Sequence, residues 1–285
     1  MNAAWKDYIN ITKPRIVLSN LIAAFAGFWL ASSWKIDWML LIVTLLGSSL
    51  VMACSCVFNN LLDREMDVKM ARTRNRPLAS GRLQPRNVII YGTILGLAGE
   101  AVLVMVNPLT ALLGFVGILV YVVIYTAWLK RTSTWSTAVG GISGAMPPVI
   151  GYTAVTNEID LGAVLLFAFL FCWQPPHFWA LGIRRIEDYR AAGFPLLPVV
   201  KGIQRTKIQM IPYVVLMNVS TALLYAFGYT GLAFLFVTAA MGLTWLYYCI
   251  AGLKAKDDQK WAHNIFKFSV HYLTIVNIVM VLNTQ

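Results

Sequence analysis

Long apolar runs, separated by short polar or charged segments, dominate the hydropathy pattern of the chain. A helix that crosses a bilayer needs about 20 apolar residues, and nine runs are close to this length or longer. Asn107-Pro108 and Gly228-Tyr229-Thr230 divide two longer apolar stretches, because these residues favour turns. We therefore predict an all-α protein with nine transmembrane helices. They lie at Ile16–Ser33, Trp38–Phe58, Val88–Val106, Leu109–Leu129, Trp135–Val155, Leu161–Ile183, Ile208–Phe227, Gly231–Leu253 and Ile265–Leu282.

Composition supports a protein that is solvated mainly by lipid. Of the 285 residues, 59% are hydrophobic and 12% are charged, against roughly 45–50% and about 25% in soluble domains. The mean hydropathy is +0.68. So few polar residues cannot cover a soluble globule, and the composition also excludes a disordered chain, a collagen and a coiled coil. We predict a polytopic membrane protein that forms one domain over residues 1–285.

The basic residues are distributed very unevenly between the two ends of the predicted spans. With nine spans, 22 of the 23 Lys and Arg residues fall on the side of the N-terminus, and Lys35 alone falls on the other. Basic loops stay in the cytoplasm. We therefore predict a cell (inner or plasma) membrane protein whose N-terminus and large loops, about 59–87 and 184–207, are cytoplasmic and whose C-terminus is outside. This topology explains most of the net charge of +11, so we expect no nucleic-acid partner.

The first large loop continues the second span without a helix-breaking residue, so we expect the helix to extend into it. Asn59, Asp63 and Asp67 then lie four residues apart on one face. Carboxylates one turn apart repel each other unless a cation lies between them. Mg²⁺ takes oxygen ligands and is commonly shared between one or two carboxylates and the phosphates of a substrate. Basic residues that match phosphate oxygens follow directly: Lys69, Arg72, Arg74 and Arg76. The segment predicts a diphosphate site with Mg²⁺ on Asn59, Asp63 and Asp67.

Two further segments bring candidate chemistry to the same side of the membrane. The sixth span ends near Trp173 and His177, among other aromatic residues and just before the charges of the second loop. Those charged residues are Arg184, Arg185, Glu187 and Asp188. The fourth span ends in Tyr125, followed by Lys130 and Arg131. We expect these side chains to surround the same diphosphate site.

Some polar residues lie inside predicted spans, where an ionisable or amide group is a functional candidate by default. They are Asn20, Glu100 and His271. We expect Asn20 to face the site. The residues alone assign no role to Glu100.

These segments resemble the UbiA superfamily of intramembrane prenyltransferases and, within it, the protoheme IX farnesyltransferases. The pattern Asn-x-x-x-Asp-x-x-x-Asp, followed by Arg-Thr-x-x-Arg-Pro, is met between Asn59 and Pro77. The block Trp173–Leu181 and the stretch Gly193–Pro198 resemble the haem branch in particular. The resemblance implies a UbiA-type fold, with nine helices around a central cavity.

The resemblance also implies a reaction. A farnesyl group would pass from farnesyl diphosphate to the vinyl group of haem B, with addition of water, to give haem O and diphosphate. It implies Mg²⁺ as the cofactor, Asp63 and Asp67 as catalytic residues, and Glu187 or Asp188 as a guide for the water. The implied substrate-binding residues are Asn20, Asn59, Asn60, Lys69, Arg72, Arg76, Tyr125, Lys130, Arg131, Trp173, His177, Arg184 and Arg185. Membrane lipid, haem B and farnesyl diphosphate are the expected partners, with a haem A synthase or a terminal oxidase assembly downstream. With haem as a substrate, His177 and His271 are candidates for contact with its iron, since histidine is a common axial ligand.

Three other interpretations stay open from the sequence. A quinone-type aromatic polyprenyltransferase of the same superfamily would carry Asn-Asp in place of Asn59-Asn60. It would also carry a second Asp-x-x-x-Asp where this chain has Ile183 and Glu187, with Asp188 next. A transporter of an anionic amphiphile would need polar groups at mid-membrane, where these spans are mostly apolar. A haem-handling protein without catalysis would have no use for Asp63 and Asp67.

Overall fold

The computed structural model describes residues 3–285, and every regular element in that range is a helix. Short helices are α1 (Ala3–Ile11), α6 (Lys130–Thr132), α7 (Ser136–Gly144), α8 (Met146–Thr156), α10 (Ile186–Ala192) and α11 (Leu197–Val200). The longer elements are α2 (Pro14–Ser32), α3 (Trp38–Asp67), α4 (Pro85–Val106), α5 (Pro108–Ile118) with the π-helix η1 (Leu119–Leu129), α9 (Leu161–Arg184), α12 (Ile203–Ala226), α13 (Leu232–Gly252) and α14 (Asp258–Leu282). The predicted all-α class is confirmed.

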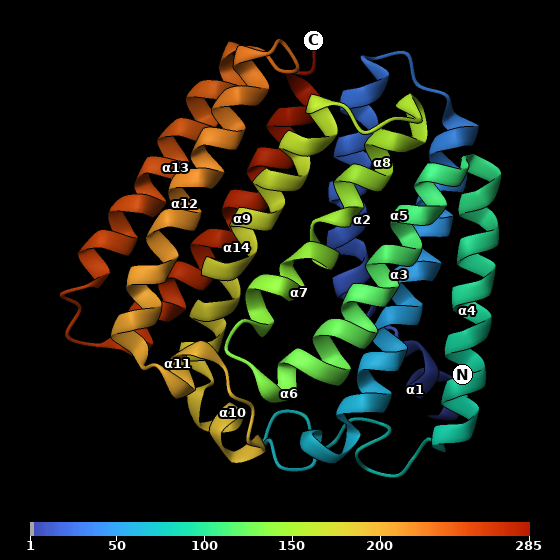
Figure 1. The fold of residues 1–285 in the computed structure, drawn as a ribbon, viewed down its shortest axis with the longest axis vertical. Helices are drawn as coiled ribbons and strands as arrows, with labels where there is room; N and C mark the ends of the chain where they lie inside the picture. The colour runs from blue at the N-terminus through green and yellow to red at the C-terminus, as the bar shows by residue number, and fades with distance from the viewer. Residues whose placement is uncertain (1–2) are drawn as a thin grey trace.

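The predicted count of nine long spans is not confirmed. Within residues 3–285, eight helices are long and apolar enough to cross a membrane, with α5, η1 and α6 counted as one. The predicted span Trp135–Val155 is instead divided at Ala145 into α7 and α8, of 9 and 11 residues. Two prolines fall in the first turn of α8, where proline is tolerated because the missing N–H has no helical partner. The two short helices together follow the path of the expected fifth span (Figure 1).

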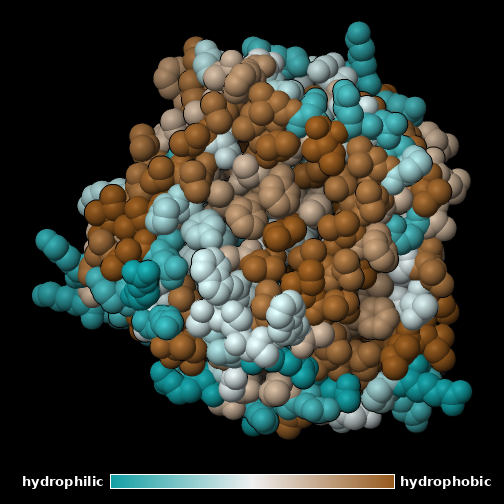
Figure 2. Space-filling view, viewed as in Figure 1, coloured by the Kyte–Doolittle hydropathy of each residue, from teal (hydrophilic) through white to brown (hydrophobic). Residues whose placement is uncertain are grey.

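The helices run up and down between two ends of the molecule. Figure 1 shows α1, α6, α10, α11 and the connection from α3 to α4 at the lower end, and the C-terminus at the upper end. The segments that carry most basic residues therefore gather at one end, while the turn with Lys35 lies at the other. Figure 2 shows hydrophobic residues over most of the middle of one face and hydrophilic ones mainly along its edges.

Helices α2 and α8 pack backbone to backbone at two glycines. A Cβ atom on Gly27 would lie less than 3.0 Å from the carbonyl oxygen of Pro148. One on Gly151 would come equally close to the carbonyl oxygen of Ala24. Small residues permit this close approach in membrane bundles. The contact fixes α8, and through it α7, against the N-terminal half of the molecule.

Candidate active site

The last two turns of α3 carry the paired carboxylates. Helix α3 continues to Asp67, which confirms the predicted extension of the second span beyond Phe58. The side chains of Asp63 and Asp67 point into protein, because each residue is only 1% exposed. Buried carboxylates need cations or hydrogen-bond donors to stay charged, so the neighbours of these two residues define the site.

Asp63 lies in a chain of polar contacts that joins three elements. Its Oδ2 forms an ion pair with Nζ of Lys130, from α6. The same oxygen accepts a hydrogen bond from Nδ2 of Asn59 at 3.0 Å. Oδ1 of Asn59 in turn accepts from Nζ of Lys13 at 2.5 Å, and its Nδ2 also approaches Oγ1 of Thr126 at 3.2 Å. The contacts hold Asp63 and Asn59 in one fixed arrangement.

Asp67 is held by the loop that follows it. Nη1 of Arg76 donates to both carboxylate oxygens of Asp67, at 3.0 and 2.8 Å. The hydroxyl of Thr73 donates to the backbone oxygen of Asp67 at 3.0 Å. The loop therefore folds back over the end of α3 and brings a guanidinium group to the second carboxylate.

The cations of the site outnumber the carboxylates. Lys13, Arg76 and Lys130 contact Asn59, Asp67 and Asp63 respectively. Burial, together with the nearby cations Arg76 and Lys130, lowers the pKa of Lys13 to about 8. Three basic groups against two acidic ones leave a surplus of positive charge, which favours an anionic ligand.

The segment after α9 completes this end of the site. Phe194 and Leu196 pack in one apolar cluster with Met66 and Met70, from the end of α3 and its loop. The ammonium group of Lys130 lies 4.8 Å from the ring centroid of Phe194. The two large predicted loops therefore meet around Lys130.

A second cluster surrounds His177 between α9 and α14. The imidazole is stacked between Trp173 and Phe266, with ring centroids 4.4 and 4.7 Å away. Its Nδ1 lies 2.6 Å from Oγ of Ser269, which itself donates to the backbone oxygen of Phe266 at 2.7 Å. A serine hydroxyl has one proton, so an Oγ that donates to Phe266 can only accept from Nδ1 of His177, an arrangement that leaves a lone pair on Nε2.

Comparisons with known proteins decide the family. The sequence profile described as the UbiA prenyltransferase family matches residues 20–271. The chain belongs to this family. It is 46% identical to protoheme IX farnesyltransferase 1 of Bacillus subtilis (strain 168), over 98% of this chain and 90% of that protein. It is also 46% identical to protoheme IX farnesyltransferase 2 of Pseudomonas putida (strain W619), over 98% and 95% of the two chains. The chain is an integral membrane protein.

Solved structures confirm the UbiA fold. A structure of digeranylgeranylglyceryl phosphate synthase superposes with a TM-score of 0.82 at 19% identity, covering 98% of each chain. A UbiA homologue of Archaeoglobus fulgidus, bound to GPP and Mg²⁺, gives a TM-score of 0.70 at 17% identity, over 96% of this chain and all of that one. These similarities establish the fold only. The ligands that this UbiA-family chain binds have to be inferred from its own residues.

The carboxylate site of this UbiA-family chain fits a hard divalent cation. Oδ1 of Asp63 is buried and has no hydrogen-bond partner among the described residues. No cluster of three or more Asp, Glu, His or Cys side chains in residues 3–285 is arranged to hold a metal. Mg²⁺ commonly keeps several waters and binds one or two carboxylates together with substrate phosphates, so a pair of carboxylates matches the protein donors that this ion uses.

The other predicted binding residues fall into two groups. Some make contacts within the protein: Nδ2 of Asn60 donates to the backbone oxygens of Ile11 and Cys56, at 3.0 and 2.9 Å. Arg131 donates to the backbone oxygen of Leu62, and Asn20 donates to that of Ile16 at 2.9 Å. The others are exposed: Lys69, Arg72, Arg185 and Glu187. The first three form no ion pair with a described residue, and Glu187 pairs only with Arg190 of its own helix, at 2.5 Å.

The remaining predicted residues lie near the two clusters or apart from them. Gly140 of α7 leaves room for the ring of Tyr125. The centroid of that ring lies 5.8 Å from the ammonium group of Lys130. The guanidinium group of Arg184 lies 4.8 Å above the ring of Phe266, beside His177. Asp188 is half-buried. Glu100 and His271 lie apart: Oε1 of Glu100 has no partner among the described residues, and exposed His271 lines a cavity of about 290 Å³ on α13 and α14.

Sequence reasoning missed residues whose partners are distant in the chain. Lys13 and Thr126 contact Asn59 across 46 and 67 positions, and Ser269 contacts His177 across 92. The only local signal for Lys13 is its place as a basic residue just before the first predicted span. Thr126 and Ser269 carry no such signal, because serine and threonine are common inside membrane helices.

Proposed function

We propose that this protein transfers a farnesyl group from farnesyl diphosphate to a vinyl group of haem B, with addition of water, and so forms haem O and diphosphate. Relatives that are 46% identical over nearly the whole chain bear the name protoheme IX farnesyltransferase. The observation that carries the proposal for this chain is the pair of buried carboxylates, Asp63 and Asp67, surrounded by three basic groups. Such a site is suited to a diphosphate and a divalent cation.

We assign Asp63, Asp67 and the amide oxygen of Asn59 to the binding of Mg²⁺. Bound there, Mg²⁺ would offset the negative charge that develops on the departing diphosphate. Lys130 and Arg76 now compensate the two carboxylates. When the ligands bind, these cations and Lys13 are free to donate to diphosphate oxygens instead, since the carboxylates then have another positive partner. Lys69 and Arg72, which are exposed on the loop after α3, would meet the outer phosphate.

The bond changes follow from the chemistry of an allylic diphosphate. The C–O bond of farnesyl diphosphate breaks and leaves an allylic cation, which the terminal carbon of the vinyl group attacks to form a C–C bond. Water then adds to the neighbouring vinyl carbon and loses a proton. The aromatic rings of Tyr125, Trp173 and Trp179 would exclude water and stabilise the cation through their faces. We assign the positioning of the later water to Asp188 or Glu187.

The acceptor side of the site rests on the His177 cluster. Because Nδ1 of His177 is committed to Ser269, its Nε2 is available for a haem iron or for another contact with the porphyrin. Arg184 lies beside this cluster, and with Arg185 would face carboxylates of the acceptor. Three further residues would support substrate binding indirectly, because their side chains donate to backbone oxygens and so hold the helices in place: Asn20, Asn60 and Arg131.

We also propose a location and an order of events. The basic end of the bundle would face the cytoplasm of a cell membrane and the C-terminus would lie outside, as the positive-inside rule requires. Farnesyl diphosphate would then enter with its charged head at the cytoplasmic surface and its chain in the bilayer. Haem O would pass to a haem A synthase or to a terminal oxidase under assembly.

The direct test is incubation of the purified protein with haem B, farnesyl diphosphate and Mg²⁺, followed by mass analysis of the porphyrin. We expect a mass increase equal to one farnesyl group plus one hydroxyl, and no product with Asp63→Asn or Asp67→Asn. Lys254→Gln is the matched control, since this exposed cation lies in the loop between α13 and α14. An aromatic acid offered as the acceptor should stay unmodified; its prenylation would favour a quinone-type enzyme.

A further inference from the structure

The outward face of α14 carries polar side chains along the membrane-spanning part of the helix. A series of exposed residues on this helix follows alternating spacings of four and three positions. Positions with this spacing align on one side of a helix, and we call the strip that they form the α14 seam. It consists of Lys260, Asn264, Lys267, His271, Thr274 and Ile278.

The rise of the helix sets the depth of the seam in the membrane. At 1.5 Å per residue, Lys267 lies about 13 Å from the start of α14 at Asp258, and His271 lies about 20 Å from it. The whole helix is about 37 Å long, only a little longer than the hydrocarbon core of a bilayer, which is about 30 Å thick. His271 therefore lies near the middle of the membrane, and Lys267 lies between it and the surface.

Ionisable side chains at these depths normally face the interior of a bundle or a water-filled cavity. Those of the seam face outward, and Asn264, Lys267 and His271 form no hydrogen bond or ion pair with any residue in the range 3–285. Buried polar neighbours on the same helix do form such bonds, since Trp261 and Ser269 donate to backbone oxygens at 3.0 and 2.7 Å. The outward groups therefore lack the partners that an apolar environment requires.

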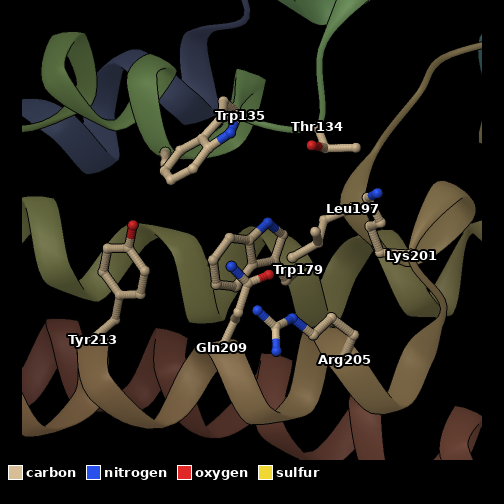
Figure 3. A pocket seen from close by; sticks show the side chains of 9 residues that line it. Thr134, Trp135, Trp179, Leu197, Lys201, Arg205, Gln209 and Tyr213 are labelled. Carbon is tan, nitrogen blue, oxygen red and sulfur yellow. The ribbon is translucent and has the colours of Figure 1, made fainter.

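A groove runs beside the seam, between α13 and α14. It encloses about 290 Å³, and three seam residues line it beside the rings of Tyr248 and Phe268. A larger cavity of about 500 Å³, between α7, α9, α11 and α12, also has exposed cations, Lys201 and Arg205, at one end (Figure 3). Those two lie just before α12 and in its first turn, where cations at a membrane surface are common. Only beside the seam do exposed polar groups continue to mid-membrane.

The spacing of the seam favours a helix as its partner. Alternating steps of four and three residues are those with which membrane helices pack at crossing angles near +20°, and the groove can accept side chains of a second helix. A phospholipid fits less well, because its headgroup occupies a layer only about 5–7 Å thick at each surface, and His271 lies deeper. A second copy of this chain in the same orientation would bring the two Lys267 side chains to the same depth, where like charges repel.

We propose that the α14 seam is the docking surface for a transmembrane helix of another protein, one that carries a carboxylate at the depth of Lys267. A carboxylate accepts a hydrogen bond from the ammonium group and also neutralises its charge, which a neutral acceptor does not do. Asn264 and His271, about one turn to either side, would each meet a hydrogen-bonding side chain of the same helix. The inference is independent of the reaction proposed above, since the exposed seam faces away from buried Ser269, the α14 residue that contacts His177.

The test measures energy transfer from the tryptophans of the full-length protein to a dansyl-labelled synthetic peptide, in vesicles of phosphatidylcholine. The peptide is a leucine-rich helix of about 20 residues with one glutamate at the depth of Lys267. The same peptide with leucine at that position is the chemical control. The key variant is Lys267→Leu, which alters one exposed side chain. The matched control is Lys201→Gln/Arg205→Gln, which removes two exposed cations beside the other cavity.

We expect the wild type to bind the glutamate peptide about fivefold more tightly than the leucine peptide, since a hydrogen bond between membrane helices contributes about 1 kcal/mol. Lys267→Leu should bind both peptides equally, and Lys201→Gln/Arg205→Gln should keep the fivefold preference. Equal binding of the two peptides by the wild type would overturn the proposal, as would a preference that persists in Lys267→Leu. Competition by added phosphatidylglycerol would identify a lipid site instead, and self-association that Lys267→Leu abolishes would identify a second copy; either result would also overturn it.

Discussion

Replacement of Lys130 by methionine leaves the carboxylate of Asp63 buried without its ammonium partner. The side chains of Asp63 and Lys130 are only 2% and 11% exposed, so water cannot take the place of the lost cation. Removal of one partner from a buried pair costs about 3–5 kcal/mol. Since Nδ2 of Asn59 still donates to Asp63, we expect the lower end of that range, about 3 kcal/mol, in the presence of a metal chelator.

The loss should depend on the metal. With Mg²⁺ and inorganic diphosphate present, Asp63 regains a positive partner. Addition of these ligands should therefore raise the free energy of unfolding more in Lys130→Met than in the wild type. A ligand at one hundred times its Kd contributes about 2.7 kcal/mol, which is close to the expected deficit. The assay is unfolding in detergent micelles, followed by tryptophan fluorescence, with chelator or with Mg²⁺ and diphosphate.

Two controls make this prediction specific. Lys69→Met removes an exposed cation that pairs with no described residue, and should be neutral within about 0.5 kcal/mol. Asp63→Asn/Lys130→Met removes both charges, and should cost less than the sum of the two single changes. If Lys130→Met and Lys69→Met were equally stable in chelator, the buried ion pair and the reasoning built on it would be refuted.

Three further predictions concern packing, the haem side and topology. Gly151→Ala should destabilise the bundle by about 1–3 kcal/mol in thermal unfolding, because the added Cβ meets the backbone of α2; Gly117→Ala, with no atom nearer than 3.8 Å, should be neutral. Ser269→Ala should change the Soret spectrum of bound haem B, since the α9 histidine loses the contact that fixes its tautomer; an unchanged spectrum would remove that imidazole from the acceptor site. Lys35→Cys should react with a membrane-impermeant maleimide in intact cells, and Lys254→Cys should not. The four native cysteines are buried and should give a low background. The reverse labelling would show that the topology is opposite to the one proposed.

The positions of the long helices follow from the sequence because apolar length and interrupting turns are strong local signals. The same holds for the end of α3, where four-residue spacing alone puts Asp63 and Asp67 on one face. The break at Ala145 was not predicted, although Gly144 and the prolines at 147 and 148 lie beside it. An uninterrupted apolar run hides such a break, since hydropathy does not distinguish one long helix from two short ones.

The contacts of the site were much less accessible than its location. Lys130 was expected to bind diphosphate, and its pairing with Asp63 depends on how η1 and α6 pack against α3. The contacts of Lys13 and Ser269 depend likewise on helices far apart in the chain. Spacing within one segment predicts which residues share a face, whereas contacts between segments arise from packing that no local pattern encodes.

The central claim is that Asp63 and Asp67 hold a divalent cation against the diphosphate of the prenyl donor. Mn²⁺ suits the same oxygen ligands as Mg²⁺ and is paramagnetic. In the wild type with a non-hydrolysable farnesyl diphosphate analogue, electron–nuclear double resonance should detect strong coupling between Mn²⁺ and ³¹P. The account predicts that Asp63→Asn and Asp67→Asn each abolish this protein-bound signal, whereas Lys254→Gln, in the loop between α13 and α14, retains it. An unchanged coupling in both aspartate variants would contradict it.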